Sequence, residues 1–258
     1  MSTVTREEKI SDAFVAMTGA LMKNYDIVDL LSTLLSQSTE ILDMEAGGIL
    51  LVDAAGELEL VASTSEEAQV VETIIIAAGA GPCIDCYESG AAVSVADIRT
   101  DSDAWPKFRE TALREGFRST YAVPMRIRDE VVGVMNLLTT TPGPLSERDG
   151  AIAQSLADIA VLGILHERNF RNPHGVGEQL HLALDTRILV EQAKGVLAHG
   201  EAMSMTDAFQ SLRGYARQQD MSLRAVAEAI VYRRLSTADL RSAQAPAQAP
   251  AQAPQHSE

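Results

Sequence analysis

The segment STYAVPMRIRDEVVGVMNLLTT, residues 119–140, contains two β-rich runs separated by the short polar turn Arg128-Asp129-Glu130. The runs are long enough to pair as antiparallel strands. An earlier segment, GGILLVDAAGELELVAST (47–64), has the same form, with two β-rich runs around a turn at Ala55-Gly56. Strands joined by short turns predict an antiparallel sheet rather than a parallel one, which needs long crossover connections.

Helical segments flank these strands. We expect helices at 8–22, 26–42 and 66–77, a strand at 91–98, a helix at about 105–116, and a closing helix that starts after Ser146. Asp26 can cap the second helix, and Ser146 with Asp149 forms a capping box. Residues 77–90 are rich in glycine, and we assign no helix or strand to them. The expected fold class is α+β, an antiparallel sheet with helices packed outside.

From residue 178 to residue 235 the pattern is helical throughout. The first helix, about 178–199, is expected to end at Gly200; the second opens at Ser204 with Asp207 three residues on, and the third starts after Ser222. Ala208, Phe209, Leu212 and Ala216 of the second helix are expected to be buried, as are Leu223, Val226, Ala227, Ile230 and Val231 of the third. Three helices make a small core, so this unit needs a neighbour or a dimer partner to pack against.

The charge is unevenly distributed along the chain. The net charge is −15, but residues 1–177 hold 27 acids and 13 bases, whereas 178–242 hold 8 of each. An acidic protein is a poor partner for nucleic acid unless its cations are clustered. The C-terminal helices supply such candidates in Arg187, Lys194, Arg213, Arg217, Arg224, Arg233 and Arg234.

Three further segments bear on organisation. The closing helix carries Ile152, Leu156, Ile159, Gly163 and His166 at alternating steps of four and three, a stripe that either forms a coiled coil in a homodimer or packs on its own sheet. Residues 171–177 (RNPHGVG) break the pattern as a linker, and the tail at 241–258 repeats Ala-Gln-Ala-Pro, which predicts disorder. With no apolar leader or spanning segment evident, we expect a cytoplasmic protein without a membrane partner.

The segments GPCIDCYESG, VSVADI, WPKFRETALREGFRSTYAVPMRI, VVGVMNLL and PLSERD, in that order, resemble a GAF domain. This family provides sensory modules that often enclose a small ligand between the sheet and a covering loop and helix. The resemblance implies a small-molecule partner without identifying it, so we assign no cofactor.

The segments ALDTRILVEQAKGVL, DAFQSLRGYA and SLRAVAEAIV are similar to the ANTAR domain, a three-helix RNA-binding output module of antitermination regulators. The matching first-helix residues are Arg187, Glu191, Gln192, Ala193, Lys194, Gly195 and Leu197. The resemblance implies binding to RNA hairpins in leader transcripts, which favours the antiterminated form and lets transcription continue.

Glycine inside the first of these helices requires an explanation, because it costs about 0.5–1 kcal/mol relative to alanine. In the functional interpretation, Gly195 leaves room for a phosphate or an unpaired base beside the mobile charge of Lys194. In the alternative, a neighbouring helix packs closely against Gly195 and Lys194 is merely solvated.

The candidate RNA-binding residues are Lys194, Gly195, Arg213 and Arg217, followed by Arg187, Tyr215 and Arg224. Arg213 and Arg217 are four residues apart and therefore share a helical face, and the ring of Tyr215 could stack on a base. The acidic N-terminal unit would repel RNA, and we hypothesise that this repulsion serves as an off state.

Cys83 and Cys86 in GPCIDC are candidates for redox chemistry, because some GAF domains are free-methionine sulfoxide reductases that use cysteines. The alternative is that both thiols pack as small hydrophobic groups. No histidine occurs in 1–165, so we predict no metal site there. Duplex DNA binding by the last helix is a further alternative, with only Ser222 and Arg224 near its start to read bases.

We therefore predict an N-terminal helix (1–24), a GAF sensor domain (25–167), a linker (168–177), an ANTAR RNA-binding domain (178–240) and a tail (241–258). The predicted function is a signal-responsive, RNA-binding antitermination regulator that is not an enzyme and forms a homodimer. The alternatives are a GAF-based thiol redox sensor or reductase and a regulator that binds duplex DNA.

Overall fold

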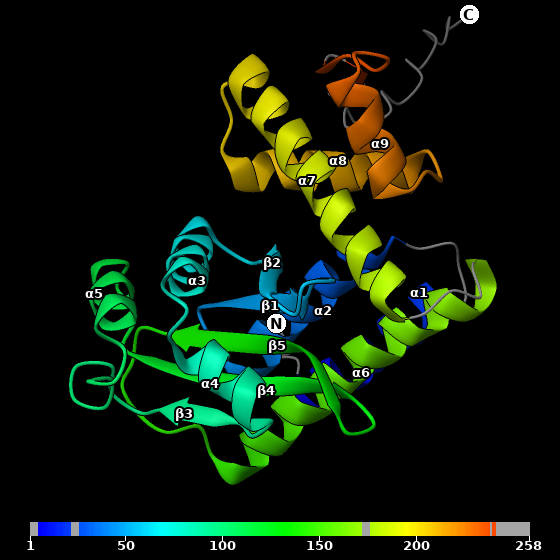
Figure 1. Ribbon diagram of the computed structural model, residues 1–258. Helices are drawn as coiled ribbons and strands as arrows, with labels where there is room; N and C mark the ends of the chain where they lie inside the picture. The colour runs from blue at the N-terminus through cyan, green and yellow to red at the C-terminus, as the bar shows by residue number, and fades with distance from the viewer. Residues whose placement is uncertain (1–4, 22–25, 172–175, 238, 241–258) are drawn as a thin grey trace, which may run out of the picture.

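The computed structural model describes residues 5–21, 26–171, 176–237 and 239–240, with only the backbone at 16–21, 166–171 and 176–181. It contains an N-terminal α+β unit and a C-terminal helical unit, which lies over one end of the first (Figure 1). The predicted tail and part of the predicted linker lie outside these residues.

Five strands form one antiparallel sheet in the described part of the chain. They are β1 Ala46–Val52, β2 Leu58–Ser63, β3 Val93–Val95, β4 Ser119–Ile127 and β5 Glu130–Thr139, in the order β2-β1-β5-β4-β3. Both predicted hairpins are confirmed, since β1 pairs with β2 and β4 with β5. The strand predicted at 91–98 is shorter, because only 93–95 pair with β4.

Helices cover both faces of this sheet. Leu51, Val123 and Met135 belong to one hydrophobic cluster with α1 Arg6–Leu21, α2 Ile27–Leu42 and α6 Glu147–Arg171. Leu50, Ala122 and Val134 are their neighbours along the strands and belong to a second cluster, with α3 Glu66–Ala78, α4 Pro82–Ser89 and α5 Pro106–Arg114. This alternation follows from the two-residue period of a strand, and it confirms the α+β fold.

The helix α4 was not predicted from the sequence. It lies within the glycine-rich segment, and both of its ends carry recognisable signals. Pro82 stands in its first turn, where the missing N–H costs nothing, and Gly90 ends it at φ 64°. Gly79 ends α3 and Gly81 precedes α4, so neither glycine lies inside a helix. Their closeness in the sequence indicated a loop and so led the eight-residue helix to be missed.

The apolar stripe of α6 packs inside its own unit. Leu156 is 3 % exposed, and an added Cβ at Gly163 would lie 2.4 Å from Leu30 Cδ2 of α2. Gly163 therefore permits the close crossing of α2 and α6. Of the two interpretations of the stripe, packing within the chain accounts for these residues; the side chain of His166 lies outside the described ones.

The C-terminal unit contains α7 Val176–Glu201, α8 Met205–Gln218 and α9 Leu223–Val231. The hydroxyls of Ser204 and Ser222 cap α8 and α9 as predicted, accepting from the amides of Asp207 and Ala225. The predicted end of α7 at Gly200 was wrong: the helix continues to Glu201 and is terminated by Ala202, at φ 51°.

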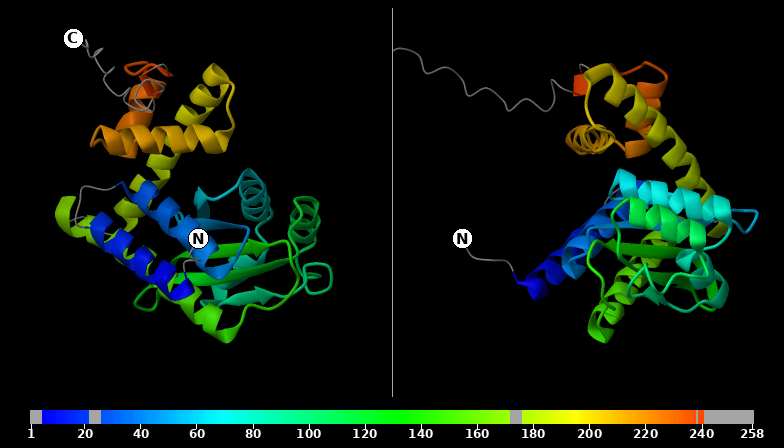
Figure 2. Two further views of the ribbon diagram at one scale, coloured as in Figure 1. Left: turned by 180° about the vertical axis from the view of Figure 1, so that it is seen from behind. Right: turned by 90° about the vertical axis from the view of Figure 1, so that its left-hand side faces the viewer.

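The core of the C-terminal unit is continuous with the α2–α6 side of the sheet. Leu31, Leu34, Val190, Leu212 and Val226 belong to the same hydrophobic cluster. Figure 2 shows from two further directions that α7 rises from the N-terminal unit and carries α8 and α9 with it. The small helical core thus packs against a neighbour within the same chain.

No single helix in the described segments is long and apolar enough to cross a membrane; only the bent pair α3 and α4, taken together, reaches that length and composition.

Replacing Gly133 with alanine is predicted to destabilise the sheet. An added Cβ would lie 2.4 Å from the carbonyl oxygen of Leu50 and 2.8 Å from Leu51 Cδ2, on the neighbouring strand β1. Backbone cannot yield as a flexible side chain does, so we expect a loss of about 1–3 kcal/mol in the free energy of unfolding. Urea denaturation followed by circular dichroism measures this loss, and an unchanged midpoint and slope would contradict it.

Candidate nucleic-acid interface

Arg213 of α8 is buried against the N-terminal unit. Its side chain is 9 % exposed and forms an ion pair with Asp29 of α2, from Nε to Oδ1. Its Nη2 donates to Thr33 Oγ1, one turn further along α2, at 2.5 Å. A guanidinium can be buried only when such partners compensate its lost hydration.

Arg217 lies one turn after Arg213 and reaches the same carboxylate. Its Nη2 is 3.5 Å from Asp29 Oδ2, and its side chain is 60 % exposed. The two arginines therefore share a helical face, as their spacing predicts. Both of their guanidinium groups contact the carboxylate of Asp29.

Arg224 contacts α2 through its backbone rather than its charge. Its amide, in the first turn of α9, donates to Asp26 Oδ2 at 3.1 Å, while Asp26 Oδ1 accepts from the amide of Val28 at 2.9 Å. One carboxylate thus caps two helices, one in each unit. Burial raises the pKa of Asp26, and the amide hydrogen bonds oppose that rise. The guanidinium of Arg224 turns toward Thr186 of α7, with Nη1 3.4 Å from its hydroxyl.

Lys194 is largely buried and paired with an acid, a placement that neither interpretation anticipated. Its side chain is 12 % exposed, and Nζ pairs with both carboxylate oxygens of Glu191, at 2.8 and 3.0 Å. The ammonium also lies 5.8 Å from the ring centre of Phe209, whose ring is 5.5 Å from Arg213 Cζ. Phe209 was expected in the core, but it is only partly buried and its ring makes cation–π contacts with both Lys194 and Arg213.

Gly195 faces open space. Nothing lies within 4 Å of a Cβ added there, so close helix packing does not explain this glycine within the described residues. Ile188, Gln192, Val196 and His199 are also exposed on α7, at helical spacing around it. The open helix surface that the functional interpretation requires is therefore present.

The remaining two candidates are committed to packing. Arg187 donates through Nη1 to the carbonyl oxygen of Leu60 in β2, and burial lowers its pKa. Tyr215 is partly buried and packs against the hydrophobic cluster. Both side chains are therefore partly buried in contacts within the chain.

The structure therefore gathers Arg213, Arg217 and the amide of Arg224 on the first turns of α2, and leaves Gly195 exposed on another face of α7. Sequence reasoning missed the partners, Asp26, Asp29 and Thr33, which lie some 180 to 200 positions away in the sequence. It also missed the Glu191–Lys194 pair, although the spacing of three residues was visible.

The two units are not packed tightly along their whole contact. Two crevices of about 60 and 30 Å³ lie between them, and both are lined by Ser32, Ser63, Gln69, Lys194 and Phe209. Such volumes suit only a few water molecules. The seam beside Lys194 is polar and has room for water.

Two known family models match successive parts of the chain. The model of the GAF domain family matches residues 24–164, more than half of the chain, and the model of the ANTAR domain matches residues 178–231. The chain belongs to the GAF domain family and carries a C-terminal ANTAR domain. No curated protein sequence matches it.

Solved structures show the same GAF fold. A free methionine-R-sulfoxide reductase from Neisseria meningitidis, in complex with its substrate, is 19 % identical at a TM-score of 0.51, covering 66 % of this chain and 96 % of its own. The GAF domain of a phosphoenolpyruvate-protein phosphotransferase from Coxiella burnetii is 18 % identical at a TM-score of 0.50, covering 62 % of this chain and 95 % of its own. At these identities the similarity establishes the fold alone. The GAF and ANTAR domains together support a signal-responsive regulator of the ANTAR type.

Between α3 and the sheet, the GAF domain contains a buried row of hydrogen-bonded polar side chains. Asn136 Nδ2 donates to Glu72 Oε1 at 2.6 Å, and Thr120 Oγ1 donates to Asn136 Oδ1 at 2.7 Å. Glu72 is fully buried, with no hydrogen-bond partner for Oε2 among the described residues. Burial raises its pKa to about 7, partly offset by hydrogen bonds from Asn136 and the neighbouring Cys83 thiol.

Both cysteines of the GAF domain are free and fully buried. Burial and the nearby Glu72 carboxylate raise the pKa of Cys83 well above its usual value, and burial raises that of Cys86 to about 12. A thiol must ionise and be accessible to react, so this arrangement suits packing better than redox chemistry. The described residues contain no group of three or more metal-ligating side chains.

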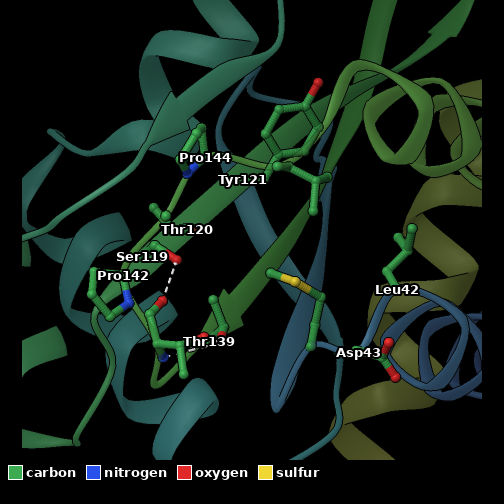
Figure 3. A pocket seen from close by; sticks show the side chains of 12 residues that line it. Leu42, Asp43, Ser119, Thr120, Tyr121, Thr139, Pro142 and Pro144 are labelled. Carbon is green, nitrogen blue, oxygen red and sulfur yellow. Dashed lines mark hydrogen bonds between the residues drawn. The ribbon is translucent and has the colours of Figure 1, made fainter.

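A pocket of about 240 Å³ opens at the end of the GAF sheet (Figure 3). Its lining includes the side chains of Ser119, Tyr121, Thr139 and Thr141, beside Pro142 and Pro144 of the loop that follows β5. The Ser119 hydroxyl donates to the carbonyl oxygen of Thr141 at 2.9 Å. Asp43 is the one charged residue of this lining, so the pocket suits a neutral polar molecule better than an anion.

Replacing Gly195 with alanine is predicted to stabilise the ANTAR domain by about 0.5–1 kcal/mol, because the methyl group enters open space and the helix loses its glycine. Thermal unfolding measures the gain. A destabilised variant would mean that something outside the described residues packs at this position.

Replacing Glu72 with glutamine is predicted to change how stability depends on pH. A buried acid whose pKa lies near 7 rather than 4.5 destabilises the fold increasingly as pH rises between these values, by at most about 3 kcal/mol. The glutamine variant does not lose stability in this way. The difference in the free energy of unfolding between the variant and the wild type should therefore grow in favour of the variant from pH 4.5 to pH 7 and then level off. Urea titrations across this range measure the advantage, with exposed Glu67 of the same helix replaced by glutamine as the control. A difference in unfolding free energy that stays constant with pH would contradict the raised pKa of Glu72.

Proposed function

We propose that this protein is a transcription antitermination regulator in which the ANTAR domain binds RNA hairpins of leader transcripts and the GAF domain senses a small molecule. The observation that carries the proposal is the cluster of Arg213, Arg217 and the α9 N-terminus on one anionic surface. Guanidinium groups and a free helix N-terminus are the groups that proteins use to bind phosphate. The matched ANTAR family supports RNA as the source of that phosphate.

The open surface at Gly195 supports the same function. Proteins read RNA sequence mainly at unpaired bases, which need room to approach the protein backbone. A helix surface without side-chain bulk provides that room, and the adjacent exposed side chain of Gln192 offers both a donor and an acceptor. We assign base contacts to this face of α7 and phosphate contacts to α8 and α9.

Two alternatives from other classes are less well supported. A reductase needs an accessible thiol of low pKa, and neither Cys83 nor Cys86 meets that requirement. A duplex-DNA reader needs a recognition helix with free side chains near its start. The two side chains near the start of α9 are engaged, since the Ser222 hydroxyl caps the helix and the Arg224 guanidinium approaches Thr186. We further propose a cytoplasmic location and a homodimer, which agrees with the paired hairpins that an antiterminator presents.

The experiment that tests this function compares binding of the full chain to a tandem-hairpin RNA and to a duplex DNA of equal length at two salt concentrations. We expect preferential binding to RNA, with an affinity that falls as salt rises because each phosphate contact releases a counterion. Equal or stronger binding to the duplex DNA would favour the DNA-binding alternative.

Replacing Arg217 with glutamine is predicted to weaken RNA binding at low salt and to lower the slope of log K against log salt by about one, as the loss of one phosphate contact does. Arg99, an exposed arginine of the GAF domain, supplies the control when it is replaced by glutamine. Equal slopes for both variants would remove Arg217 from the interface.

A further inference from the structure

The ANTAR domain presents an anion-binding site with its anion in place. The donors are the guanidinium groups of Arg213 and Arg217 and the first-turn amide of α9 at Arg224. The acceptors are the carboxylates of Asp29, in the first turn of α2, and of Asp26, the N-cap of that helix in the GAF domain. All three contacts therefore cross from one domain to the other.

The start of α2 is comparable to a short piece of phosphate backbone. Asp26 is the N-cap of the helix and Asp29 lies in its first turn, and both carboxylates reach the C-terminal helices, Asp26 at the Arg224 amide and Asp29 at Arg213 and Arg217. Each carboxylate presents oxygen acceptors with negative charge, which are the features that a phosphodiester presents to arginine and to a helix N-terminus.

We propose that the first turn of α2 occupies the phosphate-binding site of the ANTAR domain, so that the GAF domain and the RNA backbone compete for the same donors. This inference rests on the proposed RNA-binding function. The regulated step is then the separation of α2 from α8 and α9.

Burial makes the two occupants mutually exclusive. The side chain of Arg213 is 9 % exposed and that of Asp29 is 25 % exposed while they are paired. A phosphate cannot take the place of Asp29 on Arg213 unless Asp29 leaves, because Nε already donates to Asp29, Nη2 donates to Thr33 and the side chain is almost fully buried. Only Arg217, at 60 % exposure, can contact RNA without this separation.

Water-sized space lies close to one end of the seam. Phe209 lines both crevices, and the centre of its ring is 5.5 Å from Arg213 Cζ. Contacts between domains of one chain generally resemble transient protein interfaces, and here the polar contacts of the seam lie beside the apolar cluster that Leu31 and Leu212 share. If only a fraction f of the molecules is open, the apparent Kd for RNA is the intrinsic Kd divided by f.

The test replaces Asp29 with asparagine in the full chain, which removes the charge and keeps the shape. We expect the variant to bind the tandem-hairpin RNA about tenfold more tightly than the wild type at matched salt, which corresponds to about 1.4 kcal/mol. The control is Glu40→Gln, which neutralises an exposed acid on the same helix whose ion-pair partner is Lys9 of α1. If Asp29→Asn and Glu40→Gln raise the affinity equally, general charge repulsion is the cause and the proposal is overturned.

A second variant separates the two roles of Arg213. Arg213→Gln opens the seam but also removes a phosphate contact, whereas in the Asp29→Asn background only the second effect remains. The affinity lost on adding Arg213→Gln should therefore be larger in the Asp29→Asn chain than in the wild type. Equal losses in both backgrounds would show that Asp29 and RNA do not compete for Arg213.

Hydrogen exchange supplies a readout that does not depend on RNA. The amide of Arg224 should exchange faster in the Asp29→Asn chain than in the wild type or in Glu40→Gln, because the seam that holds it against Asp26 opens more often. Unchanged exchange together with unchanged affinity overturns the competition while leaving RNA binding intact. Absence of RNA binding by the wild type and by Asp29→Asn alike overturns the proposed function itself.

Discussion

The buried guanidinium of Arg213 is the constraint on which the relation between the two domains depends. Removing such a charge from water costs several kcal/mol unless an opposite charge and well-placed hydrogen bonds replace the lost hydration. In this chain Asp29 and Thr33 of α2 provide that replacement. The ANTAR domain can therefore keep Arg213 inside the protein only while α2 is beside it, and once α2 leaves, the guanidinium must find water or another anion.

The position of α2 is in turn fixed by the sheet. Leu31, Leu34 and Leu35 of α2 are completely buried, and the helix packs against β1 and β2 of the sheet. A carboxylate on the edge of such a helix that faces α8 moves only when the helix moves, because close-packed cores transmit displacement rather than absorb it. The acids that hold the ANTAR domain are thus attached rigidly to the sensor fold. A change at the sheet has a direct mechanical route to Arg213 that needs no intervening loop.

Local patterns in the sequence predicted most of the fold and little of this contact. The hairpins followed from β-rich runs around short turns, and Ser204 and Ser222 cap their helices as their positions indicated. The helix α4 was missed because glycines at 79 and 81 outweighed the Pro82 and Gly90 signals. The face shared by Arg213 and Arg217 was predictable from their spacing of four, whereas the partner of that face was not, since Asp29 is 184 positions away and only the packing of α2 against α8 brings it there.

The overall negative charge suggested that the acidic sensor would repel RNA, and the structure offers a stronger physical basis for an off state. Repulsion between exposed charges is screened beyond about 10 Å at 0.1 M salt, so it varies smoothly and cannot be abolished by a small movement. A carboxylate bonded to a buried arginine is screened far less and is either in place or absent. The first arrangement adjusts affinity gradually, whereas the second has two states that a ligand of the GAF domain can favour differently. A sensor that must turn an output on and off therefore gains more from two well-placed aspartates than from the remaining excess of acidic charge.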